Sequence, residues 1–328
     1  QALAEVTARF GGVYTSHIRN QGNELLNSVD EAILLAKKTG VAVIISHLKA
    51  YGLSNWGKVE AALEKIDAAR AQGCRVMADF YPYDSSESTL MYEIPEWAKA
   101  GGASGMIRRL QDPQQRDQIR RDIKQRGELS WDRVVISGVK DPHNSALIGR
   151  SIAQIAENSV PARAPFDVAA DLLQSEQGGV STICRLMSAA DVERVAVAGV
   201  TALGSDSYAL AEGRPFTGHP RNWGAFPHFY DTYVRKKKLL KPQQAVYKMS
   251  GMAADFLGVE DRGKIKTGFR ADLVLFDPER IAGPADFTTP DTPSEGIDMV
   301  MVNGEVQYKQ HRLQRKAAGE ILLKQRGN

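Results

Sequence analysis

The sequence of 328 residues has few cysteines, no long apolar run and no large excess of charge of either sign. Its two cysteines, Cys74 and Cys184, cannot build a disulfide framework or a Cys-x-x-Cys site, so we expect buried thiols in a reducing compartment, the cytoplasm. No apolar run reaches the roughly 20 residues of a membrane span, so no membrane partner is expected. The net charge is only +3, and no basic cluster carries interleaved aromatics, which argues against a nucleic-acid partner.

The sequence does contain a regular alternation of strand and helix patterns. Runs of small and β-branched apolar residues, typical of strands buried on both faces, occur at 13–17, 41–47, 75–80 and 200–206. Apolar residues at helical spacing follow the first two runs, at 29–38 and 59–72. Ser28 and Glu31 predict a capping box at the start of the first of these helices. This order predicts βαβ units and a parallel sheet, which is an α/β fold.

Two regions depart from the alternation. Between about residues 95 and 195, glycines and prolines interrupt the pattern, and we expect an insertion over the rim of the sheet. Its expected elements are helices at 115–125, 167–174 and 189–198 and a strand at 134–137. After residue 263, short strands are expected at 265–268, 271–277 and 299–306, with a hairpin turn at Asn303-Gly304. Further helices are expected at 1–10, 229–238 and 242–257.

Three polar residues, His17, His47 and Asp206, end three of the predicted strands. Parallel strands bring their carboxyl ends to one rim, so these side chains should face one cavity. Two imidazoles and a carboxylate form the ligand set of a catalytic zinc or similar ion that keeps a position open for water. The alternative is that each histidine serves only as a hydrogen-bonded structural residue.

Cations and phenols lie close to the same strand ends. Lys49 and Arg221 could hold a substrate carboxylate, and Arg19 could do the same or form a surface salt bridge. Tyr81 and Tyr83 could donate hydrogen bonds at this rim or could simply pack there. The remaining histidines are expected to be structural or exposed: His143, His219, His228 and His311.

Several short motifs, taken together, resemble one known family. In order along the chain they are 14–19 (YTSHIR), 45–49 (ISHLK), 55–57 (NWG), 79–83 (DFYPY), 204–206 (GSD) and 219–226 (HPRNWGAF). This order resembles that of the N-acyl-D-amino-acid deacylases, or D-aminoacylases, which are metal-dependent TIM-barrel hydrolases of the amidohydrolase superfamily. The later segments 262–268 (RGKIKTG), 271–274 (ADLV) and 302–304 (VNG) resemble the part of a β-sandwich that closes many proteins of that superfamily.

The resemblance implies a fold, a reaction and roles for individual residues. Residues 1–262 would be the second half of a (β/α)8 barrel, including the insertion, and residues 263–328 would be part of a β-sandwich. His17 and His47 would bind one or two Zn²⁺ or another divalent ion. Asp206 would serve as a metal ligand and as the general base and acid, and Lys49, Tyr81 and Arg221 would hold the substrate carboxylate. The reaction would be hydrolysis of an N-acyl-D-amino acid to a carboxylic acid and a free D-amino acid.

Some family features are missing from the sequence. The His-x-His pair of a first barrel strand and an early bridging ligand are absent, and only four barrel strands can be counted. We therefore expect that an N-terminal half of the barrel exists, as part of the same chain or as a separate one. Ser207 and Glu87 also depart from the family pattern, which leaves the substrate class open. The alternatives are a cyclic-amide hydrolase of the dihydroorotase or hydantoinase kind and a non-catalytic amidohydrolase-like subunit.

Overall fold

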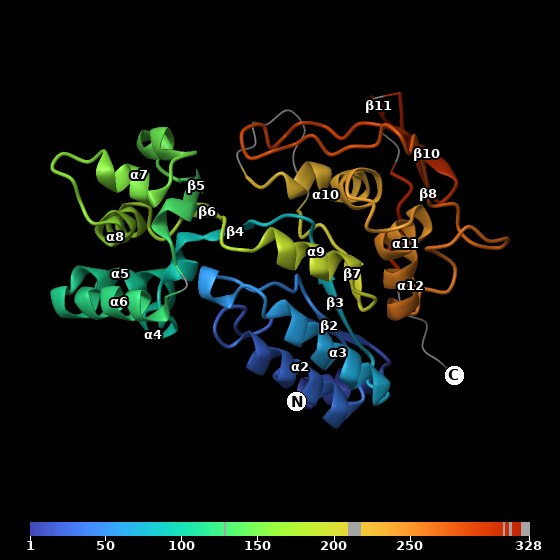
Figure 1. Cartoon of the computed structure of the whole chain (residues 1–328), viewed down its shortest axis with the longest axis horizontal. Helices are drawn as coiled ribbons and strands as arrows, with labels where there is room; N and C mark the ends of the chain where they lie inside the picture. The colour runs from blue at the N-terminus through green and yellow to red at the C-terminus, as the bar shows by residue number, and fades with distance from the viewer. Residues whose placement is uncertain (128, 209–217, 311, 315–316, 323–328) are drawn as a thin grey trace.

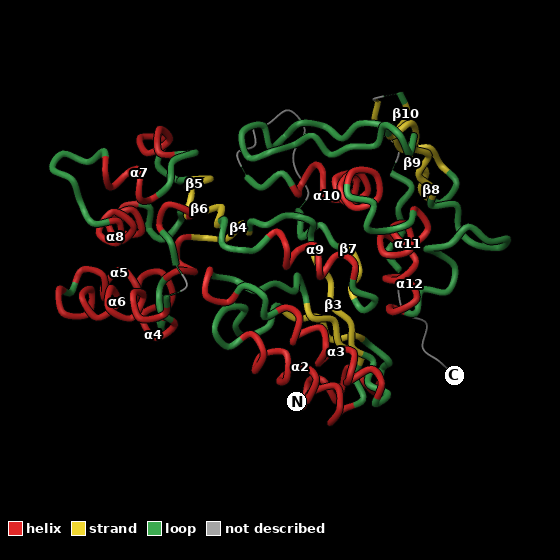
Figure 2. Tube along the Cα trace, in the orientation of Figure 1, coloured by secondary structure: helices red, strands yellow, loops and turns green. Residues whose placement is uncertain are grey.

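The computed structural model describes residues 1–127, 129–208, 218–310, 312–314 and 317–322. Its elements form three groups, each built on one β-sheet (Figure 1). The first group holds a parallel sheet, the second is a helical region with a small antiparallel sheet, and the third is a C-terminal antiparallel sheet. Figure 2 shows the loops between these groups in green, and the short segments 81–85 and 185–188 join the first group to the second. No helix within the described ranges is long and apolar enough to cross a membrane.

The parallel sheet confirms the predicted alternation of strands and helices. Its strands run in the order β1-β2-β3-β7, and all neighbouring pairs are parallel. They span Val13–Ser16 (β1), Ala42–Ile45 (β2), Val76–Phe80 (β3) and Thr201–Leu203 (β7). The helices that flank these strands span Ala2–Arg9 (α1), Leu25–Thr39 (α2), Val59–Ala71 (α3) and Ala189–Val197 (α9). Strands β2, β3 and β7 are almost entirely buried, as expected for uninterrupted apolar runs, whereas β1 at the side of the sheet is half-buried or exposed along its whole length.

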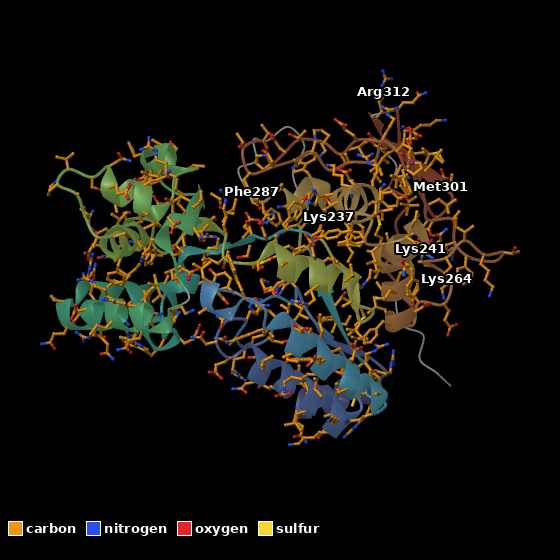
Figure 3. The ribbon with its side chains drawn as sticks, in the orientation of Figure 1. Lys237, Lys241, Lys264, Phe287, Met301 and Arg312 are labelled. Carbon is orange, nitrogen blue, oxygen red and sulfur yellow. The ribbon has the colours of Figure 1, made fainter. Side chains whose placement is uncertain are left out.

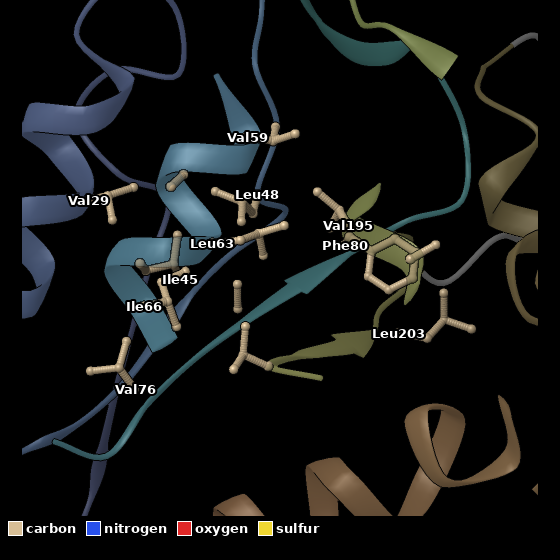
Figure 4. Packing of buried hydrophobic residues seen from close by; sticks show 14 of the residues in the cluster. Val29, Ile45, Leu48, Val59, Leu63, Ile66, Val76, Phe80, Val195 and Leu203 are labelled. Carbon is tan, nitrogen blue, oxygen red and sulfur yellow. The ribbon is translucent and has the colours of Figure 1, made fainter. Parts of the chain in front are cut away.

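Helices α2, α3 and α9 cover one face of this sheet and form the main hydrophobic core with it. Figure 4 shows Leu63 and Ile66 of α3 lying toward Ile45 of β2 and Val76 of β3. Ile66, Ile45 and Val76 are fully buried. The opposite face of the sheet carries a smaller apolar cluster. Because the strands are parallel, the carboxyl ends of β1, β2, β3 and β7 all lie at the same rim of the sheet.

The predicted capping box of the second helix is wrong. Helix α2 begins at Leu25, so Ser28 lies inside the helix and its hydroxyl accepts a hydrogen bond from the Asn20 amide N–H at 3.1 Å. Glu31 instead forms a salt bridge with Arg19 at 2.7 Å. The side chain of Asn20 accepts from the amide of Glu24 at 3.1 Å and so satisfies one of the free donors at the helix start. The apolar pattern alone did not show that the helix starts four residues earlier.

The region after β3 forms a second, separate hydrophobic core. Its antiparallel sheet has the order β4-β6-β5, with strands at Ser86–Thr89 (β4), Val134–Gly138 (β5) and Ser181–Cys184 (β6). Its helices span Glu96–Lys99 (α4), Gly102–Gln111 (α5), Pro113–Arg126 (α6), Ile152–Glu157 (α7) and Pro165–Ser175 (α8). The helices predicted at 115–125 and 167–174 and the strand at 134–137 are confirmed. Strands β4 and β6 were not predicted, because they are short and rich in serine and threonine.

The C-terminal part confirms a small antiparallel sheet with the order β11-β10-β9-β8. Its strands span Leu273–Phe276 (β8), Ile297–Val302 (β9), Glu305–Lys309 (β10) and Arg312–Leu313 (β11). The strand predicted at 265–268 is wrong: this stretch turns, with the amide of Phe269 donating to the carbonyl of Lys266. The preceding helices span Arg221–Tyr230 (α10), Pro242–Val246 (α11) and Met252–Leu257 (α12), and π-helical turns continue α10 through Lys236 and join α11 to α12. Both cysteines are free, and Cys184 is buried whereas Cys74 is half-buried.

Candidate active site

A cavity of about 260 Å³ lies at the carboxyl ends of the parallel strands. His17 directly follows β1, His47 comes two residues after β2, and Asp206 comes three residues after β7. The six predicted site residues all line this cavity: His17, His47, Lys49, Tyr81, Asp206 and Arg221. Arg19 is exposed and pairs with Glu31, so it does not contribute.

The two imidazoles lie side by side. His17 Nδ1 is 2.9 Å from His47 Nε2, and the rings meet edge to face with centroids 4.6 Å apart. Burial lowers the pKa of both histidines, and the nearby charge of Lys49 lowers it further, to about 2 for His47. Both rings are therefore neutral at pH 7, which is the state in which imidazole binds a metal ion.

Two residues that the sequence reasoning missed hold His47 in place. Asp79, the last residue but one of β3, accepts a hydrogen bond from the backbone N–H of His47 at 2.6 Å. This bond supports a backbone in the left-handed region, with φ at 39°, which is unusual for a residue other than glycine. The buried amide of Gln21 lies 2.9 Å from His47 Nδ1 and so fixes the orientation of the ring. Asp79 could have been found, because it is a polar residue close to the end of a buried strand, and Asp206 likewise lies close to the end of β7.

Asp206 pairs with Arg221 rather than with the imidazoles. Its Oδ2 lies 2.7 Å from Arg221 Nη1, and the carboxylate is 42% exposed whereas the arginine is 7% exposed. Within the residues that the structure describes, no three His, Cys, Asp or Glu side chains are grouped closely enough to hold a metal ion. The structure thus brings two of the predicted ligands together and places the third elsewhere on the same cavity wall.

Of the three residues predicted to bind a carboxylate, Lys49 and Arg221 both lie over the ring of Tyr81. The guanidinium of Arg221 lies 4.7 Å from the centre of the Tyr81 ring, and Lys49 Nζ lies 5.3 Å from it. Lys49 Nζ also donates to the carbonyl of His47 at 3.1 Å, and burial lowers its pKa to about 7. Burial raises the pKa of Tyr81, so its hydroxyl keeps its proton and donates a hydrogen bond to Met187 Sδ at 3.9 Å. Together these groups give one side of the cavity several hydrogen-bond donors.

His219 connects this group to the neighbouring sheet. It is completely buried, its Nδ1 accepts from the backbone N–H of Arg221 at 3.0 Å, and its Nε2 donates to the carbonyl of Ser85 at 2.9 Å. Phe287, labelled in Figure 3, packs with its ring centre 5.1 Å from that of His219. His219 therefore fixes the start of α10, where Arg221 is the first residue, relative to the segment that enters β4.

Comparisons with known proteins identify the family of the chain. The Amidohydrolase family profile matches residues 132–308, more than half of the chain. An N-acyl-D-glutamate deacylase of Alcaligenes xylosoxydans xylosoxydans is 34% identical over 308 residues, which are 94% of this chain and 54% of the relative. A D-aminoacylase of the same organism is 30% identical over 314 residues, 96% of this chain and 55% of the relative. The chain thus spans about half the length of these curated relatives.

Solved structures give the same result. A D-aminoacylase variant in complex with CuCl2 has a TM-score of 0.77 and 28% identity, over 98% of this chain and 58% of that chain. The N-acyl-D-glutamate deacylase of Bordetella bronchiseptica, complexed with zinc and a phosphonate inhibitor, has a TM-score of 0.74 and 29% identity, over 94% and 56%. These comparisons confirm the resemblance to the N-acyl-D-amino-acid deacylases. The chain belongs to the amidohydrolase family.

Proposed function

We propose that this chain provides the later part of the active site of a metal-dependent hydrolase, which releases free D-amino acids from N-acyl-D-amino acids. The observation that carries the proposal is the cavity itself, where a neutral imidazole pair, a carboxylate and a group of cations meet. The deacylase relatives match along almost the whole chain, so we do not propose the cyclic-amide or non-catalytic alternative.

The donor set suits a divalent cation such as Zn²⁺. His17 and His47 offer two neutral imidazoles with facing nitrogens, and Asp206 offers a carboxylate oxygen in the same cavity. We propose that these residues hold one or two Zn²⁺ ions, or another divalent ion. A bound ion of this kind lowers the pKa of water and polarises the amide carbonyl. Two related solved structures contain copper and zinc.

The residues of the chain can perform the remaining tasks. Lys49, Tyr81 and Arg221 would bind the carboxylate of the substrate and orient its amide bond toward the imidazole pair. Asp206 has one oxygen bonded to Arg221, so its other oxygen, Oδ1, would take the proton of the attacking water. The same oxygen would then give that proton to the leaving amine. Arg221 would hold the carboxylate in position during both transfers.

We also propose that residues 1–262 form the later half of a (β/α)8 barrel and residues 263–328 part of a β-sandwich. Among the strands that the structure describes, β1 and β7 each have one neighbour, so the parallel sheet has two open edges. Closing a barrel requires further strands between such edges. These strands would come from an N-terminal half in the same or a separate chain, and they would supply the other metal ligands.

Replacing Asp206 by asparagine tests the proposed role most sharply. Asp206→Asn keeps the shape but cannot take a proton, so kcat for an N-acyl-D-amino acid should fall by at least about a hundredfold. Zinc content, measured by atomic emission, should change little if the imidazoles hold the ion. Asp67→Asn, on the exposed side of α3, is the matched control and should keep full activity. Wild-type turnover by the Asp206→Asn protein would disprove the role of Asp206.

A further inference from the structure

Strand β4 places an additional carboxylate in the cavity. Ser86, Glu87 and Ser88 all line it, together with the six site residues. Glu87 pairs with Ile183 of β6, so the backbone that carries it is part of a sheet. Ser85, two residues before Glu87, accepts a hydrogen bond from His219 through its carbonyl. His219 in turn accepts from the backbone N–H of Arg221, so it links this strand to Arg221. The pairing of β4 with β6 and the hydrogen bonds of His219 therefore fix the position of Glu87 relative to Arg221.

The carboxylate of Glu87 lacks a full set of partners. Its Oε2 is buried and has no hydrogen-bond donor among the described residues. Burial raises the pKa of Glu87, and the charge of Arg221 together with hydrogen bonds from the His219 backbone and the Asn222 side chain opposes this effect, so only Oε2 lacks a donor. Buried acceptors in native proteins nearly always have a donor, which can come from a ligand. Glu87 Oε2 therefore marks a point where a bound molecule should offer an N–H group.

The cations of the cavity do not fill this need. Arg221 is engaged with Asp206 through Nη1, and Lys49 Nζ donates to the carbonyl of His47. Arg221 Nε is itself buried without an acceptor. The site thus has an unmatched donor on Arg221 and an unmatched acceptor on Glu87. A substrate that carries one negative and one positive group could match both of them.

We propose that Glu87 selects N-acyl-D-amino acids with a positively charged side chain, such as derivatives of D-lysine and D-arginine; this rests on the proposed deacylase function. The acylated α-nitrogen is an amide and carries no charge, so the positive group of such a substrate must lie in its side chain. Its α-carboxylate would bind the group of Lys49, Tyr81 and Arg221. A side chain that ends in a carboxylate would instead place like charge beside Glu87 and bind poorly.

A panel of substrates tests this assignment on the native, zinc-loaded protein. We expect kcat/KM for N-acetyl-D-lysine to exceed that for N-acetyl-D-glutamate by at least about tenfold. Glu87→Gln, which removes only the charge, should reduce this ratio by about tenfold, and Glu87→Lys should invert the preference. Glu64→Gln, exposed on α3, should leave the ratio unchanged. Circular dichroism should show that all variants are folded.

Two results would overturn the assignment. The first is a ratio that Glu87→Gln does not alter. The second is an equal fall in kcat for all substrates, because Glu87 would then bind the α-amine that every product shares. A lack of turnover with every N-acyl-D-amino acid would instead reject the proposed reaction. Calorimetry would then decide on Glu87 alone: N-acetyl-D-lysine should bind about tenfold more weakly to Glu87→Gln than to the wild type, and N-acetyl-D-leucine equally to both.

Discussion

At the scale of single residues, the site depends on a few side chains that other residues hold in place. His47 is fixed by Asp79 and Gln21, and Arg221 is fixed by Asp206 and His219. Such supporting contacts determine whether reactive groups keep their geometry. Burial shifts the pKa values of His17, His47, Lys49 and Tyr81, and groups with such shifts gather typically at functional sites.

His219 offers a test of this positioning at the residue scale. In His219→Ala the N–H of Arg221 loses its acceptor, so the arginine should move and KM for an N-acyl-D-amino acid should rise by about tenfold, with a smaller change in kcat. His219→Asn can place its side-chain oxygen near the former Nδ1 and should recover part of this loss. Steady-state kinetics on both variants measure the effect. An unchanged KM in His219→Ala would show that His219 has no role in placing Arg221.

The sequence predicted which residues line the cavity better than it predicted their mutual contacts. The six predicted residues line one cavity. This could be predicted because strand ends and motifs can be read from the sequence. The pairing of Asp206 with Arg221 could not be read from the sequence, because these residues are far apart along the chain. Gln21 was also out of reach, since a glutamine in a loop follows no pattern.

At the scale of elements, strand β7 is held by a buried lysine from the helical segment after α11. Lys248 Nζ donates to the carbonyl of Thr201 at 2.8 Å and also to the carbonyl of Ala198. Lys248 is only 4% exposed, and burial lowers its pKa from 10.5 to about 8. This contact ties the start of β7 to the helices that precede the C-terminal sheet.

The lowered pKa of Lys248 predicts a dependence of stability on pH. Between pH 8 and 10.5 the unfolded chain keeps a proton on Lys248 and the folded chain does not. The contribution of Lys248 to the free energy of unfolding therefore increases as the pH rises through this window. The stability of the wild type relative to Lys248→Met should therefore increase over this window. Denaturant unfolding at several pH values measures the difference. Lys37 is exposed on α2, so the difference in stability between the wild type and Lys37→Met should not change over this window. A difference for Lys248→Met that also stays constant would contradict the prediction.

Elements were predictable where one physical factor dominates. The buried parallel strands and the amphipathic helices follow directly from apolar periodicity. The predicted start of α2 was wrong because the side chain of Asn20, rather than that of Ser28, accepts from a free amide at the start of the helix. Strands β4 and β6 were not predicted, because their residues are largely polar and they pair with strands that are distant in the sequence. The cavity-facing position of Glu87 was missed for this reason, although the sequence had already marked Glu87 as unusual.

At the scale of the whole molecule, the order of the motifs along the chain predicted the family, and the comparisons confirmed it. Single motifs are weak signals, but their order reflects the order in which a fold brings strands to one rim. The chain nonetheless spans about half the length of its curated relatives. The activity of the whole protein therefore has to be measured on the native, metal-loaded form.

The most direct measurement of the central claim is the rate of amino-acid release from the two enantiomers of an N-acetyl amino acid. The zinc-loaded native protein should hydrolyse N-acetyl-D-lysine with a kcat/KM at least about a hundredfold above that for N-acetyl-L-lysine, and removal of the metal by a chelator should abolish the activity. Equal rates for both enantiomers, or undiminished rates after metal removal, would contradict the proposal that this cavity belongs to a metal-dependent deacylase of N-acyl-D-amino acids.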